Sequence, residues 1–320
     1  MPEAALAQVD VISPRSYCAG VDRAIATVEQ ALERLGAPVY VRGEIVHNRH
    51  VVDALAKHGA VFVKSELEVP EGSTIVLSAH GVAPEVREHC AARGLRVIDA
   101  TCPLVTKVHA EVRRFAKRGA TVLLVGHADH EEVIGTSGEA PDHVIIVEDA
   151  EQARTVNVPD PDNAAITTQT TLSLDDTAEI IGILQARFPA LLQGPKGDIC
   201  YATQNRQDAV KVAVADGADL VLVVGSKNSS NSNRMVEVGQ AAGAEAYLIE
   251  NANALDTAWL AGKRHIALTA GASAPEELVR EVAAVLEGYG FDRTGSETPS
   301  REGVYFALPR GKHAPSRETP

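Results

Sequence analysis

One unit occurs three times in the chain, and this repeat constrains the fold more than any other feature of the sequence. Each copy opens with a cysteine, continues through an amphipathic helical stretch and a short β-branched stretch, and reaches a glycine 24 or 25 positions after the cysteine. The pairs are Cys18 and Gly43, Cys102 and Gly126, and Cys200 and Gly225. A period of about 90 residues is too long for a solenoid repeat and is typical of whole α/β lobes. The sequence therefore predicts three lobes of related structure.

Helical and strand-like stretches alternate within each copy. In the first copy, apolar residues recur at helical spacing from Val21 to Leu35, Gly36 is the expected C-cap, and the strand-like run PVYVRG follows. This alternation predicts a small, mostly parallel sheet in each lobe, with helical crossovers that bring the functional loops to one end. The predicted ranges are 14–97, 98–194 and 195–289 for three pseudo-symmetric α/β lobes, and 290–320 for a polar C-terminal arm or tail. Within this arm, the run VYFALP is expected to lie against a lobe.

Three of the four cysteines hold equivalent places in the repeat. If the lobes pack around an axis, the sulfurs of Cys18, Cys102 and Cys200 converge near it, whereas Cys90 falls outside the pattern and is expected to be an inert, partly buried thiol. Three thiolates without a fourth leave an open coordination position, and sulfur ligands select iron–sulfur clusters or zinc. No CxxC pair, which is usual in closed structural zinc sites, occurs in the sequence. The residues favour an iron–sulfur cluster with one iron free for a substrate, and zinc is the alternative.

Polar residues gather where strand-like stretches end and helices are predicted to begin. They are His47, His80, His130, Thr170, Ser229, Ser230, Asn231 and Ser273. Hydroxyls, amides, histidines and free N–H groups at helix starts form anion-binding sites. Any single serine, threonine or asparagine is also explained as a helix N-cap, but the stretch GSKNSSNSNRM holds more of these residues than one cap needs. No GxxxxGK[ST] loop is present, so a nucleotide diphosphate is not held in the P-loop manner.

The candidate proton donor is Glu132, in the stretch HADHEEVIGT. It lies close to His130 and to the end of a predicted strand, and Glu131 is its neighbour. A solvated helix face is the alternative interpretation of both carboxylates.

Charge and composition exclude several classes of protein. The formal net charge of −13 over 320 residues leaves no basic face for nucleic acid or for an anionic membrane. No apolar run reaches the length of a membrane span. The first residues, MPEAALAQVD, have the pattern of neither a signal peptide nor a transit peptide. We therefore expect a soluble cytoplasmic protein that does not bind nucleic acid or membranes.

Eight stretches resemble, in order, the motifs of the 4-hydroxy-3-methylbut-2-enyl diphosphate reductase family. They are PRSYCAGVDRAI, EIVHN, SAHG, DATCPLVTKVH, TTQTTLS, ICYATQNRQ, VGSKNSSNSNRM and TAGASAPE. The resemblance covers about residues 12–290. It departs from the family pattern at Ser16 and Tyr17, where a glycine and an aromatic residue usually precede the first cysteine.

The resemblance implies a trefoil of three α/β lobes around one 4Fe–4S cluster. Cys18, Cys102 and Cys200 would hold the cluster, and its open iron would take the C4 hydroxyl oxygen of the substrate. Glu132 and Thr170 would lie beside this oxygen. The residues implied for the diphosphate are His47, His80, His130, Ser229, Ser230, Asn231 and Ser273.

The resemblance also implies the reaction, which is the last step of the methylerythritol phosphate route to isoprenoids. Two electrons from an external donor such as flavodoxin or ferredoxin would enter through the cluster, and the allylic C–O bond would break with loss of water. A proton from Glu132, relayed through Thr170 or the substrate's own diphosphate, would assist this step. The products would be isopentenyl and dimethylallyl diphosphate.

Three other interpretations make different predictions. A quinolinate-synthase-like enzyme acts on dicarboxylates, for which we expect more arginine or lysine near the loops. A non-enzymatic iron–sulfur sensor or scaffold requires an effector surface or a nucleic-acid patch, and the acidic chain shows neither. A zinc hydrolase would be colourless and rich in zinc.

Overall fold

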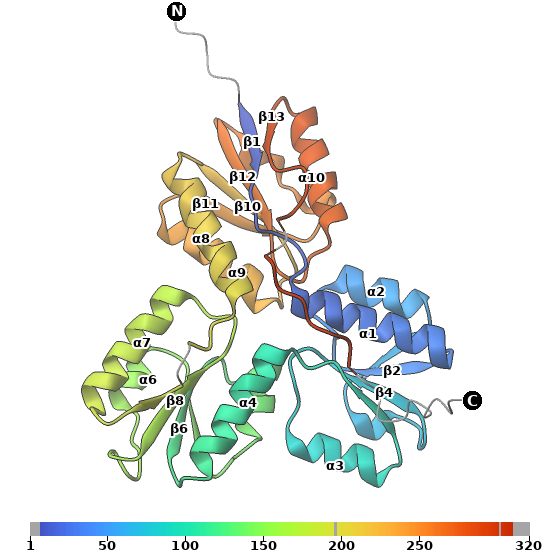
Figure 1. Cartoon of the computed structure of the whole chain (residues 1–320). Helices are drawn as coiled ribbons and strands as arrows, with labels where there is room; N and C mark the ends of the chain where they lie inside the picture. Colours follow the sequence, from blue (N-terminus) through green and yellow to red (C-terminus); the bar gives the residue numbers. More distant parts are fainter. Residues whose placement is uncertain (1–6, 195–196, 301, 310–320) are drawn as a thin grey trace, which may run out of the picture.

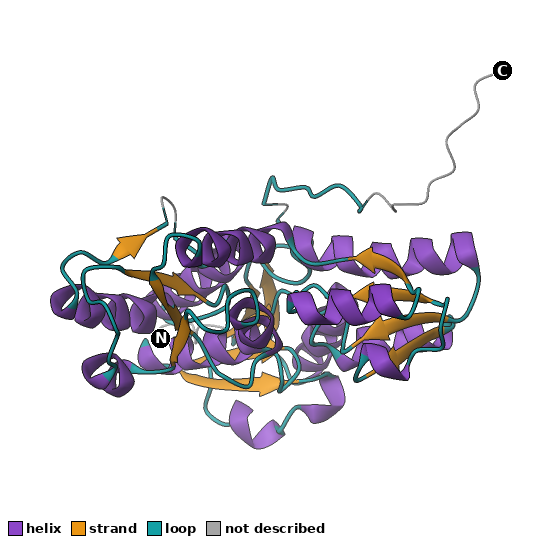
Figure 2. Ribbon diagram, turned by 90° about the horizontal axis from the view of Figure 1, so that it is seen from below, coloured by secondary structure: helices purple, strands orange, loops and turns teal. Residues whose placement is uncertain are grey.

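The computed structural model describes residues 7–194, 197–300 and 302–309. Three α/β lobes surround a common centre, in the form of a trefoil (Figure 1). Seen from the side, the lobes lie in one flattened layer (Figure 2). Each lobe has its own sheet, and all of the strand pairs in the three sheets are parallel. The predicted fold class of three α/β lobes with small parallel sheets is confirmed.

The first sheet has four strands with helices on both faces. In spatial order the strands are β3 (Ala60–Val63), β2 (Val39–Arg42), β4 (Thr74–Leu77) and β5 (Arg96–Asp99). The connecting helices are α1 (Ala19–Leu35), α2 (Arg49–Lys57) and α3 (Pro84–Ala92), with a 3-10 turn at Glu66–Glu68. Side chains alternate along β4, so Val76 packs with the core of α1 and α2 while Ile75 and Leu77 pack with that of α3. Gly36 ends α1 with a φ of 76°, as expected for a glycine C-cap.

The second sheet has the same order of connections. Its strands are β7 (Val144–Val147), β6 (Thr121–Val125), β8 (Ala164–Thr168) and β9 (Leu192–Gln193). Its helices are α4 (Pro103–Ala116), α5 (Glu131–Ser137), α6 (Ala150–Thr155) and α7 (Leu174–Arg187). Leu123 and Ile166 face the core of α6 and α7, and Val122 and Ala165 face Phe115 of α4.

The third sheet has five strands and joins the two ends of the described chain. In spatial order they are β11 (Glu245–Ile249), β10 (Leu220–Val224), β12 (His265–Ala270), β1 (Gln8–Val11) and β13 (Asp292–Gly295). The helices are α8 (Tyr201–Ala215), α9 (Ser230–Ala241) and α10 (Glu276–Gly288), with 3-10 turns at Ala252–Ala254 and Thr257–Leu260. The run LVLVV of β10 is buried along its whole length, as expected for a strand with both faces covered.

Each cysteine of the repeat lies at a junction between lobes. The strand before Cys102 is β5, the last strand of the first sheet, and the helix after it, α4, covers the second sheet. Cys200 likewise follows β9 of the second sheet and precedes α8 of the third lobe. Cys18 follows β1, which pairs with β12 in the third sheet, and precedes α1 of the first lobe. The N-terminal strand therefore closes the ring of lobes, and all three thiols lie at its centre.

The segment after β13 runs from the third lobe past α1 of the first lobe (Figure 1), along one face of the molecule (Figure 2). Arg23 Nε of α1 donates to the Ala307 carbonyl at 2.9 Å, so part of the VYFALP run lies against α1. The carboxylate of Glu302 pairs with the buried Arg206 of α8 at 3.0 Å. Residues 292–295, which the sequence analysis included in the polar arm, form the edge strand β13.

Parts of two expectations lie outside the described residues. They are residues 301 and 310–320 of the predicted arm and residues 1–6 of the segment analysed for a signal peptide. The four domain ranges stay predictions. None of the helices in the described residues combines the length and apolar character that crossing a lipid bilayer requires.

Candidate active site

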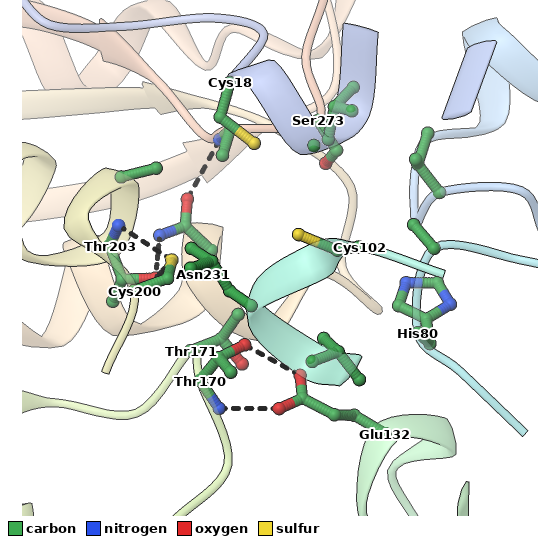
Figure 3. Close-up of a pocket in the computed structure, with 18 of the residues that line it drawn as sticks. Cys18, His80, Cys102, Glu132, Thr170, Thr171, Cys200, Thr203, Asn231 and Ser273 are labelled. Carbon is green, nitrogen blue, oxygen red and sulfur yellow. Dashed lines mark hydrogen bonds between the residues drawn. The ribbon is translucent and has the colours of Figure 1, made fainter. Parts of the chain in front are cut away.

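The sulfurs of Cys18, Cys102 and Cys200 surround one cavity at the centre of the trefoil (Figure 3). Each cysteine is the N-cap residue of a helix, so each sulfur lies near the positive end of a helix dipole. The backbone N–H of Thr203 donates to the Cys200 sulfur at 3.3 Å. Gly20 keeps the space between the thiols clear, because a Cβ atom there would lie 2.8 Å from the Cys102 sulfur and 3.7 Å from that of Cys18.

Burial makes the free thiols poor acids. It raises the pKa of Cys102 to about 12 and that of Cys200 to about 11, and the neighbouring Cys18 thiolate adds to both shifts. The pKa of Cys18 is also raised by burial. Three thiolates at these positions would repel one another, so a cationic metal group that compensates their charge would favour this form, and its binding would release protons.

The spacing of the sulfurs fits a cluster better than one metal ion. Two thiolates on one tetrahedral zinc ion lie about 3.8 Å apart, given Zn–S bonds of about 2.3 Å. In the described residues, the sulfurs of Cys18, Cys102 and Cys200 do not all lie within 4.8 Å of one another. A polynuclear cluster, which binds each thiolate to a different iron, spans a wider triangle. The donor set and the clear space beside Gly20 therefore fit an iron–sulfur cluster.

Glu132 lies fully inside the site and not on a solvated helix face. Its side chain, at the start of α5, accepts hydrogen bonds from the backbone N–H of Thr170 at 2.7 Å and from its hydroxyl at 2.9 Å (Figure 3). Burial raises the pKa of Glu132 to about 7, even though both bonds from Thr170 act in the opposite direction. A carboxyl group with this pKa holds a proton near neutral pH and can give it up.

Three histidines form a cluster on the cavity wall. The rings of His47 and His80 stack with centroids 4.0 Å apart, and that of His130 lies 5.4 Å and 6.0 Å from them. Burial lowers the pKa of His80, and it lowers that of His130 to about 3. Nδ1 of His130 accepts from the backbone N–H of Glu132 at 3.1 Å, which fits a neutral ring that caps α5.

The hydroxyl and amide residues of the third lobe also line the cavity. Ser229 caps α9 by accepting from the Ser232 N–H, so the capping interpretation holds for this residue, which nevertheless borders the cavity. Ser230 accepts from the Thr171 hydroxyl at 3.0 Å, and Asn231 Oδ1 accepts from the Ala272 N–H at 2.9 Å. Together these groups make one wall rich in donors.

Of three further residues that the sequence singled out, one lines the cavity and two lie outside it. Ser273 lines the cavity and donates to the His47 carbonyl at 3.0 Å. Cys90 is fully buried in the apolar core of the first lobe, away from the cavity. Ser16 has a φ of 60°, the left-handed region that favours glycine, and its hydroxyl donates to Glu276 at 2.7 Å.

Sequence reasoning missed several residues of the site. Thr203 donates to the Cys200 sulfur, and its position three residues after that N-cap was the available signal. Phe306 of the C-terminal arm lines the cavity, which no local pattern indicates. Glu44 and Asn228 contact His47, and Glu131 contacts His80 while its own side chain stays 37% exposed.

Fold and site together define a class: three-lobed α/β proteins with three cysteines around one central cavity and histidine, hydroxyl and amide groups beside them. The sequence model of the LytB protein family matches residues 9–287. The chain therefore belongs to the LytB protein family.

Curated relatives agree over almost the full length. A 4-hydroxy-3-methylbut-2-enyl diphosphate reductase of Mycolicibacterium vanbaalenii is 57% identical over 304 residues, which are 95% of this chain and 90% of that protein. A 4-hydroxy-3-methylbut-2-enyl diphosphate reductase 2 of Mycobacterium tuberculosis is 56% identical over 309 residues, 96% of this chain and 92% of that one. The solved structure of the E-1-hydroxy-2-methyl-but-2-enyl-4-diphosphate reductase of Plasmodium falciparum matches with a TM-score of 0.89 and 39% identity. It covers 95% of this chain and 96% of the other.

Proposed function

We propose that the chain reduces 4-hydroxy-3-methylbut-2-enyl diphosphate to isopentenyl and dimethylallyl diphosphate, the final step of the methylerythritol phosphate route. The observation that carries this proposal is one cavity bordered by three thiols, by a buried protonatable carboxyl group and by a wall of hydrogen-bond donors that can bind an anion. The reaction needs each of these groups: electrons through a metal centre, a proton for the leaving hydroxyl, and a diphosphate pocket.

Cys18, Cys102 and Cys200 would hold one 4Fe–4S cluster with an open iron site. The absence of a fourth thiol at the cavity wall formed by the described residues supports the open site. When bound, the cluster would supply the two electrons of the reduction and a Lewis-acidic iron for the leaving hydroxyl.

Glu132 and Thr170 deliver the proton that the leaving hydroxyl needs. In its protonated form Glu132 donates to the Thr170 hydroxyl, which lies 2.9 Å away and passes a proton on toward the C4 hydroxyl of the substrate. The C4–O bond breaks, the oxygen leaves as water, and a second proton is added to the allylic carbon skeleton. Two electrons and two protons are thus consumed for each water released.

Histidines, hydroxyls and amides hold the diphosphate, and this set of groups argues against a dicarboxylate substrate. The proposed residues are His47, His80, His130, Ser229, Ser230, Asn231 and Ser273, with Thr170 at the border of the cavity. In the part of the chain that the structure describes, no arginine or lysine lines the cavity. A quinolinate-synthase-like enzyme needs such side chains to grip two carboxylates.

An external electron donor and a reducing compartment complete the proposed function. Because the reduction consumes two electrons, we propose an external one-electron donor such as flavodoxin or ferredoxin. The four cysteines are free thiols, which fits the reducing conditions of the cytoplasm.

Anaerobic purification with iron and sulfide analysis, followed by an assay with a strong one-electron reductant, tests the function. We expect about four irons and four sulfides per chain and conversion of the diphosphate substrate to its two dehydroxylated products. A protein that carries a cluster but leaves this substrate unchanged would overturn the proposal, and so would a colourless protein rich in zinc.

A further inference from the structure

Two carboxylates lie behind the histidines of the proposed diphosphate pocket. Nδ1 of His47 lies 3.1 Å from Glu44 Oε2, and Nδ1 of His80 lies 3.0 Å from Glu131 Oε2. The two rings stack with an angle of 19° between their planes. Each histidine thus faces a carboxylate with Nδ1, which in His80 also lies 3.4 Å from the Ser78 hydroxyl, and keeps Nε2 for another partner.

We propose that Glu131 and Glu44 are positioning residues for the diphosphate: each holds one histidine of the stacked pair through Nδ1, so that Nε2–H donates to the ligand when the ring is protonated. This inference rests on the proposed function of the site. An imidazole with only Nδ1 protonated offers an acceptor at Nε2, whereas an imidazolium offers donors at both nitrogens. A diphosphate therefore requires the protonated form, which the carboxylates stabilise.

The contact of Glu131 with His80 joins two lobes, and Gly43 leaves space for it. Glu131 begins α5 of the second lobe, whereas His80 follows β4 of the first. Gly43 has a φ of 64°, and a Cβ atom there would lie 2.8 Å from Glu131 Oε1. Glycine suits this left-handed position and leaves the Glu131 carboxylate its place, which a Cβ atom would force to shift.

The third lobe completes the arrangement through Asn228. Its Nδ2 donates to Glu44 Oε2 at 2.7 Å and lies 3.4 Å from His47 Nδ1. The histidine pair is therefore held by one residue of each lobe: Glu44 of the first, Glu131 of the second and Asn228 of the third. A surface carboxylate with no role needs no such three-sided support.

The groups around His80 predict how its protonation changes when a diphosphate binds. Burial and the neighbouring His47 lower the pKa of His80, while Glu131 and Glu44 raise it, and the neighbouring His130 is neutral. Without a ligand, burial and the repulsion between two stacked imidazolium rings disfavour protonation of His80. A diphosphate relieves this repulsion, so its binding should be accompanied by proton uptake.

The sign of the mutational effect separates positioning from simple repulsion. If Glu44 and Glu131 were only negative charges near an anion site, neutral glutamine would tighten diphosphate binding. If they position the histidines and stabilise the protonated rings, glutamine weakens binding, because one charge-assisted donor to the ligand is lost. This loss corresponds to about a 10-fold weaker affinity or more.

Calorimetric titration of the anaerobic, cluster-loaded protein with inorganic diphosphate provides the test. It is run with chelator present, in two buffers of different ionisation enthalpy, to count the protons taken up. We expect Glu131→Gln and Glu44→Gln to bind diphosphate at least about 10-fold more weakly, with smaller proton uptake and normal iron content. In the turnover assay both should raise KM with little change in kcat, the signature of lost uniform binding.

Glu277→Gln is the matched control, since Glu277 forms an exposed pair with His50 at 2.8 Å outside the cavity. It should bind and turn over like the parent. Unchanged or tighter diphosphate binding in both test variants would overturn the inference. So would binding that requires an added divalent metal, because His47, His80 and Glu131 would then act as a cation site. A parent that binds diphosphate but does not turn over the substrate would instead count against the proposed function.

Discussion

The Glu132 carboxylate and Thr170 form a buried pair held by two hydrogen bonds, one from the Thr170 backbone N–H at 2.7 Å and one from its hydroxyl at 2.9 Å. The two residues come from different elements of the second lobe, the start of α5 and the loop after β8. The pair lies next to His130, whose Nδ1 accepts from the Glu132 N–H at 3.1 Å, so the proposed proton donor borders the proposed diphosphate pocket.

Glu132→Gln should lower turnover by about 10²–10⁴-fold, the usual contribution of a general acid. Glutamine keeps the shape and can accept from the Thr170 N–H while its amide donates to the Thr170 hydroxyl, but it has no acidic proton to give, so iron content and substrate binding should stay near those of the parent. Anaerobic turnover, iron analysis and a substrate titration measure the three quantities. The matched control is Glu277→Gln, and turnover equal to the parent in Glu132→Gln would assign the acid elsewhere.

The pH profile of kcat should have a limb that belongs to Glu132. Burial raises its pKa to about 7, so the carboxyl group is protonated below this pH and loses its proton as the pH rises through it. Turnover should therefore fall above about pH 7, and the residual turnover of Glu132→Gln should lack this limb. The measurement is kcat at saturating substrate across the pH range in which the parent keeps its iron. An identical limb in the variant would show that another group titrates.

Replacement of any one of Cys18, Cys102 and Cys200 by serine should lose iron, because we propose that these three cysteines, which line the cavity, are the sulfur ligands. Cys90→Ala should keep the iron content of the parent, since Cys90 lies in the apolar core of the first lobe. Iron and sulfide per chain and the visible absorption spectrum measure the result. Iron loss in Cys90→Ala, with iron retained in one of the other three, would contradict the argument from the repeat.

Glu302→Gln should destabilise the protein by about 3 kcal/mol, because it leaves the buried Arg206 guanidinium without its carboxylate. The side chain of Arg206 is 1% exposed and that of Glu302 is 8% exposed. In the variant, the Ser16 and Ala202 carbonyls still accept hydrogen bonds from Arg206. Urea unfolding of parent and variant measures the difference. In the control, Glu179→Gln breaks an exposed pair with Arg154 and should change the free energy of unfolding by less than about 1 kcal/mol. Equal stability of Glu302→Gln and the parent would show that the C-terminal arm is not held by this pair.

The sequence by itself determined the local elements and the threefold repeat. Helical periodicity after Cys18, Cys102 and Cys200 predicted α1, α4 and α8, because an amphipathic stripe is a local signal that one stretch of chain carries alone. The repeat then placed the three thiols at equivalent positions, and the ordered motifs indicated the family.

Tertiary structure alone decided how the lobes join and what supports the site. Strand β1 enters the sheet of the third lobe by pairing with β12, which is more than 250 residues away in the chain (Val9 with Ile266). Glu131 meets His80, and Glu302 meets Arg206, only after the lobes and the arm have packed. A carboxylate at a helix start has the same local pattern whether it is solvated or paired, so only the folded arrangement assigns its partner.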